Sequence, residues 1–494
     1  MSSSQIARKV IVYTLLVALG LTACLPSSLD SHSATGGEPS HPDTSGREGW
    51  IDWDGRGGWT TSDRHAMAEA GEEIMVEKEL AVEVTAAPAM AVADAAPAKV
   101  GAPAKADAPA EAGAPAEAAA PKGAPMPAPT PMPAPTMAPN QNQSPLRAGE
   151  VDDNAEWDDY LLYRLAYTGP PVHDRDISER YLITVNGQDE TPLLDADVAI
   201  YAGNEAVFSG RTYASGQVLF FPKALGVPDD VTSFQVVSEK DGARGEATLV
   251  RGETYQLTLN LSHAGRGTDE PVNLDVLFLI DSTGSMADEI DKLQASIRDI
   301  AARIDRLPGQ PHVRFAMTIY RDRGDLFVSR TFDFTPDVRA FHEALAEVEA
   351  DGGGDYPESL NEALHRAINA PEWRGRDTVQ IIFLVADAPP HLNYAQDYDY
   401  ATEMEKAAER GIKIFPIASS GLDEQGEYIF RQIAQFTQGR FVFLTYAGPT
   451  NSGAPGDETT HHVEDYSVEN LDDLLVRLVE EELAYQNPPL ARGQ

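Results

Sequence analysis

The sequence predicts an α/β chain whose last part, residues 271–486, folds as a doubly wound, mostly parallel sheet. A small all-β sandwich over residues 180–264 and a long, disordered N-terminal region are expected to precede it. Three observations lead to this order. Strand and helix patterns alternate after residue 271, short β-type runs with turn signals fill 180–264, and alanine and proline dominate 86–146.

The composition narrows the range of functions. A chain of 494 residues has room for two or three domains, each with its own core. Its 38 basic and 78 acidic residues give a formal charge of -40. Such a surface repels nucleic acid and anionic lipid headgroups and attracts cations. We therefore expect neither nucleic acid nor a lipid surface as a direct partner.

The N-terminus has the pattern of an export signal. A short basic start with Arg8 and Lys9 leads into the apolar stretch Val10–Leu21, which is short for a membrane span. Leu21-Thr22-Ala23-Cys24 follows, and Cys24 is the only cysteine, so no intramolecular disulfide can form. These residues resemble the lipobox of bacterial lipoproteins.

That resemblance implies a signal peptide over 1–23, a lipid on Cys24, and a cell-envelope protein facing outward, in the outer membrane or on the cell surface. An ordinary secretory signal and an unmodified cysteine are the alternatives.

The region after Cys24 has no pattern typical of a folded core. Residues 24–85 are polar and are expected to form a disordered tether, and Trp50, Trp53 and Trp59 within it receive no function. Residues 86–146 are rich in Ala and Pro and are expected to form a stalk, whose low-complexity part Ala86–Pro139 has an extended reach on the order of 150 Å at about 3.1 Å per residue. Residues 147–179 are expected to connect this stalk to the sandwich, with a short helix within Glu150–Arg164.

Short β-type runs define the sandwich. Asn186-Gly187, Ser215-Gly216 and Asp241-Gly242 are among the turn signals between them. The stretch Pro192–Phe221 resembles carboxypeptidase-regulatory-like or Cna-B-like modules of surface proteins, and a spacer without further function is the preferred interpretation. The runs are Tyr181–Val185, Asp197–Tyr201, Ala206–Thr212, Val218–Phe221, Phe234–Val237 and Thr254–Leu261.

From residue 272 the pattern predicts strands buried on both faces, with amphipathic helices between them. The expected strands are Leu274–Ile280, Val313–Tyr320, Val379–Ala386, Ile412–Ile417 and Arg440–Leu444. The expected helices are Ala287–Leu307, Val338–Val348, Glu358–Ile368, Glu403–Arg410, Tyr428–Phe436 and Val468–Ala484.

Oxygen-bearing side chains follow two of these strands. Asp281, Thr283 and Ser285 come directly after the first, spaced two apart, and Asp387 follows Ile381–Ala386. Because ligands of doubly wound sheets bind at the carboxyl ends of strands, these side chains are expected to share one crevice. Oxygen ligands suit Mg²⁺, Ca²⁺ or Mn²⁺, whereas a Ser/Asp turn that caps a helix is the alternative for the first loop.

A third acidic loop precedes a predicted helix. In Gly352-Gly353-Gly354-Asp355-Tyr356-Pro357-Glu358 the glycines permit a close approach of the backbone. Three carboxylate-bearing loops at one sheet edge are hard to explain as helix caps. The sequence therefore predicts a divalent-cation site.

This set of loops resembles the metal-ion-dependent adhesion site of von Willebrand factor type A (VWA) domains, and the resemblance covers about Pro271–Gln486. It implies first-loop ligands at Asp281, Thr283 and Ser285, with Asp387 reaching the metal through water. Many VWA domains use a threonine in the middle loop. This chain instead has the Asp-x-Pro-Glu pattern of integrin β-type domains, which implies Glu358 as a direct or near ligand and Asp355 as a ligand or a brace for a second cation.

Two further acids, Asp288 and Glu289, fall where integrin β-type domains place an adjacent calcium site. Acidic residues in the first turn of a helix, favoured by the helix dipole, are the preferred explanation.

The resulting hypothesis is a surface-tethered module that depends on a divalent metal, Mg²⁺ or else Ca²⁺ or Mn²⁺, and binds an Asp or Glu carboxylate of a partner protein. It would touch the membrane only through its lipid. The alternative is a structural or sensing envelope protein in which the metal only stabilises the loops. No HExxH, Gly-x-Ser-x-Gly or P-loop motif is present, so we do not expect an enzyme.

Overall fold

The computed structural model describes residues 50–53, 145–267, 270–354, 356–448, 456–464 and 466–487. The predicted signal peptide, Cys24, and all but a short piece of the predicted tether and stalk therefore lie outside the described residues. Within the described ranges, no helix combines the length and the apolar character that a membrane crossing requires.

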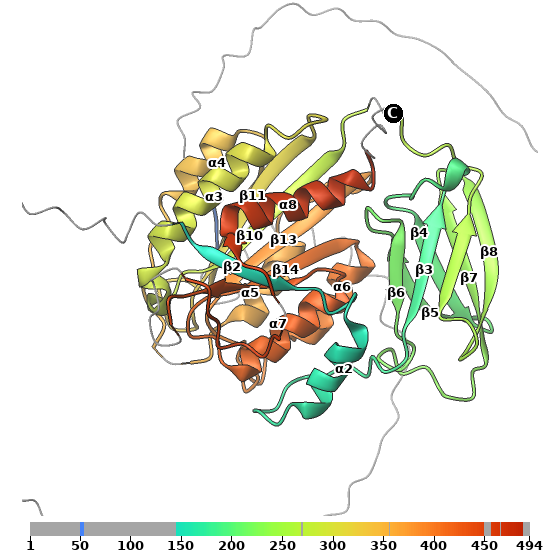
Figure 1. The fold of residues 1–494 in the computed structure, drawn as a ribbon, viewed down its shortest axis with the longest axis horizontal. Coiled ribbons are helices and arrows are strands. Elements are labelled where there is room, and N and C mark those ends of the chain that lie inside the picture. Colours follow the sequence, from blue (N-terminus) through green and yellow to red (C-terminus); the bar gives the residue numbers. More distant parts are fainter. Residues whose placement is uncertain are drawn as a thin grey trace, which may run out of the picture. The chain divides into compact units, whose positions relative to one another are not determined.

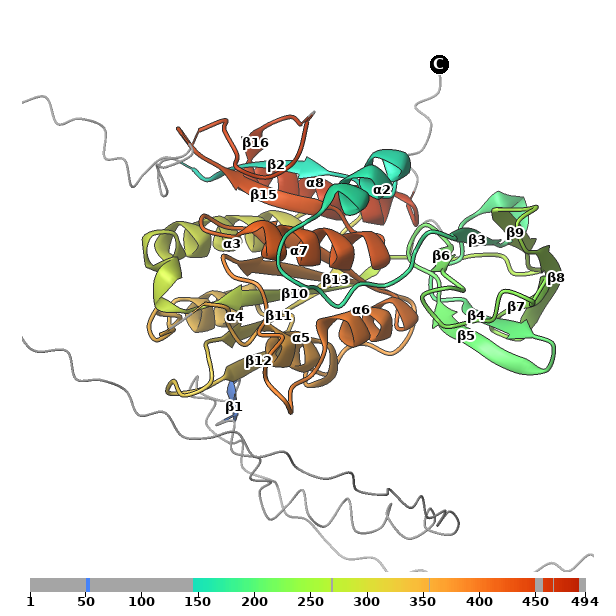
Figure 2. The same cartoon turned by 90° about the horizontal axis from the view of Figure 1, so that it is seen from below.

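A nine-stranded mixed sheet forms the larger module, in the order β1-β12-β11-β10-β13-β14-β15-β2-β16. Its five central strands, from β11 to β15, are parallel, whereas the strands on either side of them run antiparallel to their neighbours. The strands are β1 (Trp50–Trp53), β2 (Arg147–Val151), β10 (Asn273–Asp281), β11 (His312–Tyr320), β12 (Ser329–Thr335), β13 (Thr378–Ala386), β14 (Ile412–Ala418), β15 (Phe441–Thr445) and β16 (Glu469–Asn470). Figure 2 shows β1 beside β12 at one edge and β2 with β16 toward the other.

Helices cover both faces of this sheet (Figure 1). Successive side chains of a strand point to opposite faces, so in β10 Val276 and Phe278 join one core while Leu277 and Leu279 join the other. This explains why Val276–Ile280 is apolar at every position. Helices α3 (Ile290–Ile304), α4 (Val338–Leu345) and α8 (Leu471–Ala484) pack on the first face, and α5 (Leu360–Asn369), α6 (Tyr400–Glu409) and α7 (Glu424–Phe436) on the second.

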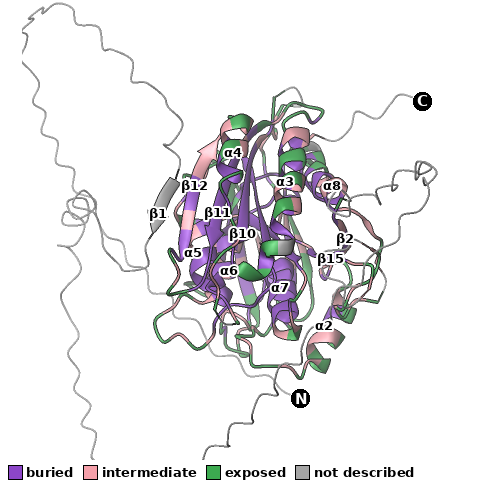
Figure 3. Ribbon diagram, turned by 90° about the vertical axis from the view of Figure 1, so that its left-hand side faces the viewer, coloured by how far each residue is buried: buried purple, intermediate pink, exposed green. Residues whose placement is uncertain are grey.

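The strand order reverses between β10 and β13, because the chain continues from β10 to β11 on one side and from β13 to β14 on the other. Loops that leave two strands at such a switch point diverge to opposite faces and open a crevice at the carboxyl ends. Asp281 ends β10 and Asp387 follows β13, so both predicted ligands flank this point. Strand β13 is buried along its whole length, and the neighbouring β10 is buried except at Asn273 (Figure 3).

The smaller module is a β-sandwich with its own core of alternating inward residues. One sheet has the order β6-β3-β9 and the other the order β5-β4-β7-β8. The strands are β3 (Tyr181–Asn186), β4 (Asp197–Ala202), β5 (Glu205–Arg211), β6 (Gln217–Phe220), β7 (Ser233–Lys240), β8 (Ala243–Val250) and β9 (Gln256–Asn260), with a 3₁₀ turn at Gln188–Glu190.

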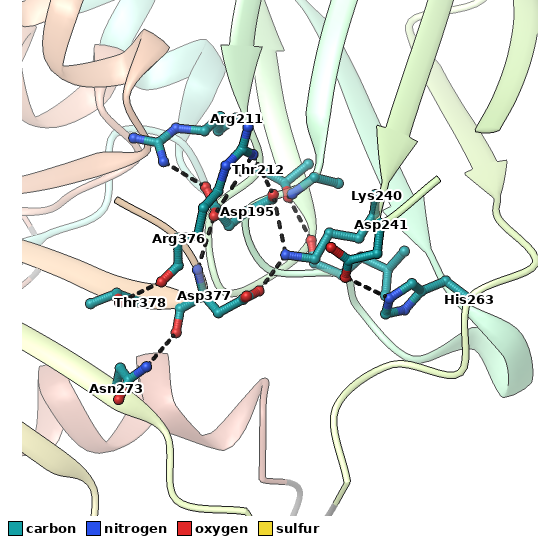
Figure 4. Close-up of polar contacts among 12 residues, drawn as sticks. Asp195, Arg211, Thr212, Lys240, Asp241, His263, Asn273, Arg376, Asp377 and Thr378 are labelled. Carbon is teal, nitrogen blue, oxygen red and sulfur yellow. Dashed lines mark hydrogen bonds and ion pairs between the residues drawn. The ribbon is translucent and has the colours of Figure 1, made fainter. Parts of the chain in front are cut away.

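Polar contacts join the sandwich to the amino edge of the large sheet (Figure 4). The Asp195 carboxylate accepts from the Arg211 guanidinium at 2.9 Å and from the backbone N–H of Asp377 at 2.9 Å. Lys240 forms an ion pair with Asp377. An apolar contact accompanies them, since the rings of Phe221 and Phe436 lie 5.0 Å apart. The sandwich thus contacts the edge opposite the predicted metal loops.

The structure differs from the prediction at several elements. The expected connecting segment supplies β2, and its helix α2 (Trp157–Ala166) begins later than expected. Strands β8, β12 and β16 were not expected, and neither was a strand at Trp50–Trp53. The helix expected from Ala287 begins at Ile290, because a 3₁₀ turn over Gly284–Asp288 precedes it.

Candidate metal centre

Asp281 lies at the centre of the site, at the end of β10. Its side chain is fully buried. One carboxylate oxygen, Oδ1, accepts from the backbone N–H of Thr283 at 2.9 Å and from the Thr283 hydroxyl at 2.7 Å, whereas Oδ2 has no hydrogen-bond partner in the described part of the chain. Burial raises the pKa of Asp281 to about 6, and the nearby charge of Asp322 adds to this.

The two hydroxyls of the first loop lie beside this carboxylate. The oxygens of Thr283 and Ser285 are 3.0 Å apart, as expected for residues spaced two apart in a tight turn. Thr283 is buried while Ser285 is exposed, so the loop presents one hydroxyl inward and one toward solvent.

Asp387 approaches from the neighbouring loop after β13. It is buried, and its Oδ1 has no partner among the described residues. Burial, followed by the charge of Asp281, raises its pKa to about 7, while the neighbouring Ser285 hydroxyl lowers it. The structure therefore brings the first and third predicted loops together.

Glu358 comes from the middle loop and has the most perturbed carboxyl of the three. Burial, followed by the charges of Asp281, Asp322 and Asp387, raises its pKa to about 9. Its Oε2 is buried without a partner in the described ranges. Its backbone N–H donates to Pro389 at 3.1 Å, which attaches the middle loop to the loop of Asp387.

Glycines allow the middle loop to approach the first. Gly353 has a φ of +64°, and a Cβ there would lie 2.7 Å from Glu358 Oε1 and 3.0 Å from Thr283 Cβ. The side chains of Glu358 and Thr283 therefore both lie close to the position that this Cβ would occupy. The N–H of Gly284 also donates to the carbonyl of Gly352 at 3.0 Å. A larger residue at position 353 would separate side chains from two loops.

Two predicted residues cannot be placed fully. Asp355 and the side chain of Asp288 lie outside the described residues. Glu289 is buried, its Oε1 accepts from the Tyr446 hydroxyl at 2.7 Å, and its Oε2 has no partner among described atoms. Its charge contributes to the raised pKa of Asp387. Glu289 lies at the N-cap position of α3, so its buried side chain stands at the start of the helix.

The sequence did not single out Asp322 and Asp325, in the loop after β11. Asp322 is buried and accepts from the Ser359 hydroxyl at 2.7 Å. Asp325 Oδ2 accepts from the N–H of Gly353 at 2.8 Å and of Asp322 at 3.1 Å. The Asp-Arg-Gly-Asp sequence reads as an ordinary charged turn, and only its position after a parallel strand could have suggested a role.

The donor set suits a hard cation. Asp281, Glu358 and Asp387 each leave one buried oxygen unpartnered in the described chain, and the charge of Asp281 raises the pKa of both other carboxyls, so these oxygens lack a positive partner there. Within the same described ranges no group of three or more His, Cys, Asp or Glu residues has the geometry of a preformed metal cluster. The predicted ligands also include the hydroxyls of Thr283 and Ser285. A group made only of His, Cys, Asp and Glu residues leaves these two ligands out.

Comparison with known families agrees with this fold. Residues 275–445 match the model of the von Willebrand factor A domain. The chain carries a VWA domain. Its matched part begins in β10 and ends with β15, so it contains the loops of Asp281, Glu358 and Asp387.

Individual relatives resemble this VWA domain only in part. The chain is 25% identical over 171 residues to the alpha-protein kinase vwkA of Dictyostelium discoideum, which covers 34% of this chain and 27% of that protein. It is 24% identical over 193 residues to a putative ariadne-like RING finger protein R811 of Acanthamoeba polyphaga mimivirus, covering 36% and 19%. The chain thus spans about a quarter or less of these relatives.

Among solved structures, proximal thread matrix protein 1 of the mussel byssus matches with 16% identity and a TM-score of 0.28, covering 44% of this chain and 47% of that one.

Proposed function

We propose that the VWA domain holds a divalent cation, Mg²⁺ or else Ca²⁺ or Mn²⁺, and uses it to bind an Asp or Glu carboxylate of a partner protein. A VWA domain indicates a role in protein–protein interaction or adhesion. The observation that carries the metal is the set of buried, unpartnered oxygens that Asp281, Glu358 and Asp387 contribute from separate loops of the described structure.

Asp281, Thr283, Ser285, Glu358 and Asp387 would hold the ion, with Asp355 as a further candidate. A bound divalent cation supplies a coordination position that an incoming carboxylate oxygen can fill. The chain itself provides a way in, because Gly284 and Ser285 are exposed beside the buried carboxylates.

The rim of the site has apolar groups that a protein partner could cover. Leu326, in the loop after β11, is 77% exposed, and Tyr356, in the middle loop, is 47% exposed. Both belong to loops at the carboxyl edge. An acidic residue that enters such a site with apolar contacts around it fits the usual organisation of a protein–protein interface.

Binding rather than catalysis is the proposed activity, because the sequence has none of the common hydrolase or nucleotide-binding motifs. The proposed location, an outward-facing lipid-anchored position in the cell envelope, depends on the lipobox-like residues that end at Cys24.

The first test measures thermal unfolding of the full chain with and without Mg²⁺. Saturation at about 100 times Kd stabilises a protein by about 2.7 kcal/mol, or roughly 5–10 °C in Tm for a domain of this size. We expect this shift in the wild type and in Asp299→Asn, an exposed control on α3, and no shift in Asp281→Ala. An unchanged shift in Asp281→Ala would refute the site.

The second test separates partner binding from simple stiffening of the loops. Proteins captured from an envelope extract are compared in Mg²⁺, in EDTA, and with Glu358→Ala. Capture that depends on both Mg²⁺ and Glu358 supports ligation of a carboxylate. Equal capture in EDTA, together with a normal Mg²⁺ shift in Tm, would mean that the metal only stabilises the domain.

A further inference from the structure

A second candidate binding site lies away from the metal loops. A cavity of about 430 Å³ opens between the sandwich and the amino edge of the VWA sheet, beside α2 and α8. Lys413 and Arg440 line it at the start of β14 and β15, whereas Asp281 ends β10. Because nine-residue strands at about 3.3 Å per residue separate the two edges by roughly 26 Å, this cavity is independent of the proposed metal site.

Most charges around the cavity are already compensated. Lys413 pairs with Glu482 at 2.5 Å. Arg440 pairs with Glu481 at 2.7 Å and with Glu150 at 3.3 Å. Neither cation is available for an anionic ligand without losing its own partner.

Arg180 is different. Its guanidinium lies 3.8 Å from the centre of the Trp157 ring, and its Nη1 donates two long hydrogen bonds, of 3.3 and 3.5 Å, to Asn154. Among the described residues no carboxylate lies within ion-pair distance of it, and its Nε and Nη2 donate no hydrogen bond. Burial lowers the pKa of Arg180, as expected for a cation with too little compensation. A planar guanidinium with one free edge is suited to bind a carboxylate or phosphate with two hydrogen bonds.

Two residues that line the cavity each have a buried polar atom without a partner in the described structure. These atoms are the side-chain Nε2 of Gln438 and the hydroxyl of Ser215. Gln438 follows the end of α7 and has a φ of 57°, in the left-handed region. Buried donors normally find partners, so unsatisfied ones beside a cavity point to a ligand that accepts hydrogen bonds.

The remaining wall is partly apolar, with Leu182 and Leu219 from the sandwich and Leu478 from α8. Three acids, Asp152, Glu481 and Glu482, line the cavity with three cations, Arg180, Lys413 and Arg440. Because these charges balance, the cavity accommodates a monoanion more easily than a phosphate dianion. A cavity with apolar walls and a few convergent polar groups is the usual form of a small-molecule site.

We propose that this cavity binds a small monocarboxylate with an apolar body, its carboxylate on the free edge of Arg180 and its body against the leucines. The ligand would contact both modules at once, so its binding would strengthen the junction between the sandwich and the VWA domain.

The test titrates the full chain with hexanoate by isothermal calorimetry, beside hexyl phosphate and hexylamine as probes of equal chain length. Arg180→Met preserves an apolar contact with Trp157 but removes the charge, and should weaken hexanoate binding tenfold to a hundredfold. Leu182→Trp, which fills the cavity, should abolish it. The matched control Arg244→Met, on the exposed edge of the sandwich, should bind like the wild type.

Several outcomes would overturn the proposal. These are no binding of hexanoate to the wild type, equal binding to Arg180→Met, or tighter binding of hexyl phosphate or hexylamine. Unchanged Tm values for the variants without ligand show that lost binding does not come from misfolding. The Mg²⁺ shift in Tm should remain in Arg180→Met, so failure here and failure of the metal site are distinguishable.

Discussion

Two aspartates on the same strand show how differently this domain treats a buried carboxylate. Asp275, near the amino end of β10, and Asp281, at its carboxyl end, are both 0% exposed. Asp275 accepts hydrogen bonds from Arg314 at 3.0 and 2.7 Å and from Arg374 at 2.9 Å. Asp281 has only Thr283 on one oxygen, and its other oxygen has no partner among described residues.

The difference separates a structural role from a functional one. Two arginines pair with Asp275, so removing its charge would leave them uncompensated. In the described structure no basic side chain pairs with Asp281; burial and the charge of Asp322 raise its pKa, and only the neutral Thr283 and Tyr320 lower it. A folded protein keeps such a group at a cost to stability, which a bound cation can offset.

The largest expected loss of stability follows from substitution of Asp275, near the amino end of β10. Asp275→Ala should destabilise the domain by about 3 kcal/mol or more, because breaking a buried pair leaves its partners unpaired. Urea denaturation measures this. Asp275→Asn keeps the shape and should cost less. If Asp275→Ala lost less than about 1 kcal/mol of stability, Asp275 would not have the structural role assigned to it here.

At the carboxyl end of β10, removing the charge of the buried aspartate is expected to stabilise the domain. In EDTA at pH 8, Asp281→Asn should be more stable than the wild type by about 1–3 kcal/mol, since a shift of one pKa unit corresponds to about 1.4 kcal/mol. The folded-state pKa is raised, so in the wild type the stabilising contribution of this group is complete below pH 4 and is lost as the pH rises through about 6. The gain should therefore shrink on going from pH 8 to pH 4. If Asp281→Asn were less stable than the wild type in EDTA at pH 8, this prediction would be wrong.

Gly353→Ala tests the close approach of the loops. Its Cβ would meet Glu358 and Thr283 at a backbone φ that disfavours side chains, so we expect a loss of about 1–2 kcal/mol and a much smaller Mg²⁺ shift in Tm. Gly354→Ala is the matched control, because a Cβ there meets nothing within 4 Å. Equal responses of the two variants would argue against a shared ion.

The smallest effect is expected at the junction of the two modules. Arg376 pairs with Asp197 through two contacts of 3.0 Å, but both side chains are about half exposed. Arg376→Met should cost less than about 1 kcal/mol by thermal or urea unfolding. A cost as large as that of Asp275→Ala would show that exposed and buried pairs contribute alike here.

Much of the large domain could be predicted because its central strands contain apolar runs, such as Val276–Ile280 and Ile381–Ala386, and Asp281 and Asp387 follow these runs directly. The parallel fold itself brings Asp281 and Asp387 to one edge, so strand assignment was sufficient to predict their proximity. Glu358 needed the further clue of its glycine loop.

The rest depends on contacts that local sequence does not encode. Strand β2 is a short Arg-Ala-Gly-Glu-Val run. It pairs with β15, which follows it by almost 300 residues in the sequence, so no local pattern indicates this pairing. Strand β8 contains Gly245 and alternates exposed residues with half-buried ones, which weakens its pattern. Asp322 gains its importance only when Ser359 and Glu358 pack beside it.

The placement of β1 has a mechanical consequence. Its four residues pair with β12, from Trp50↔Phe332 to Trp53↔Ser329, while β2 joins the sheet beyond β15. If the chain is tethered ahead of Trp50 as proposed, a pulling force reaches the molecule first at β1. The four residue pairs between β1 and β12 would separate before the parallel strands around Asp281 bear load. Loss of this edge strand would therefore come before any distortion of the proposed binding edge.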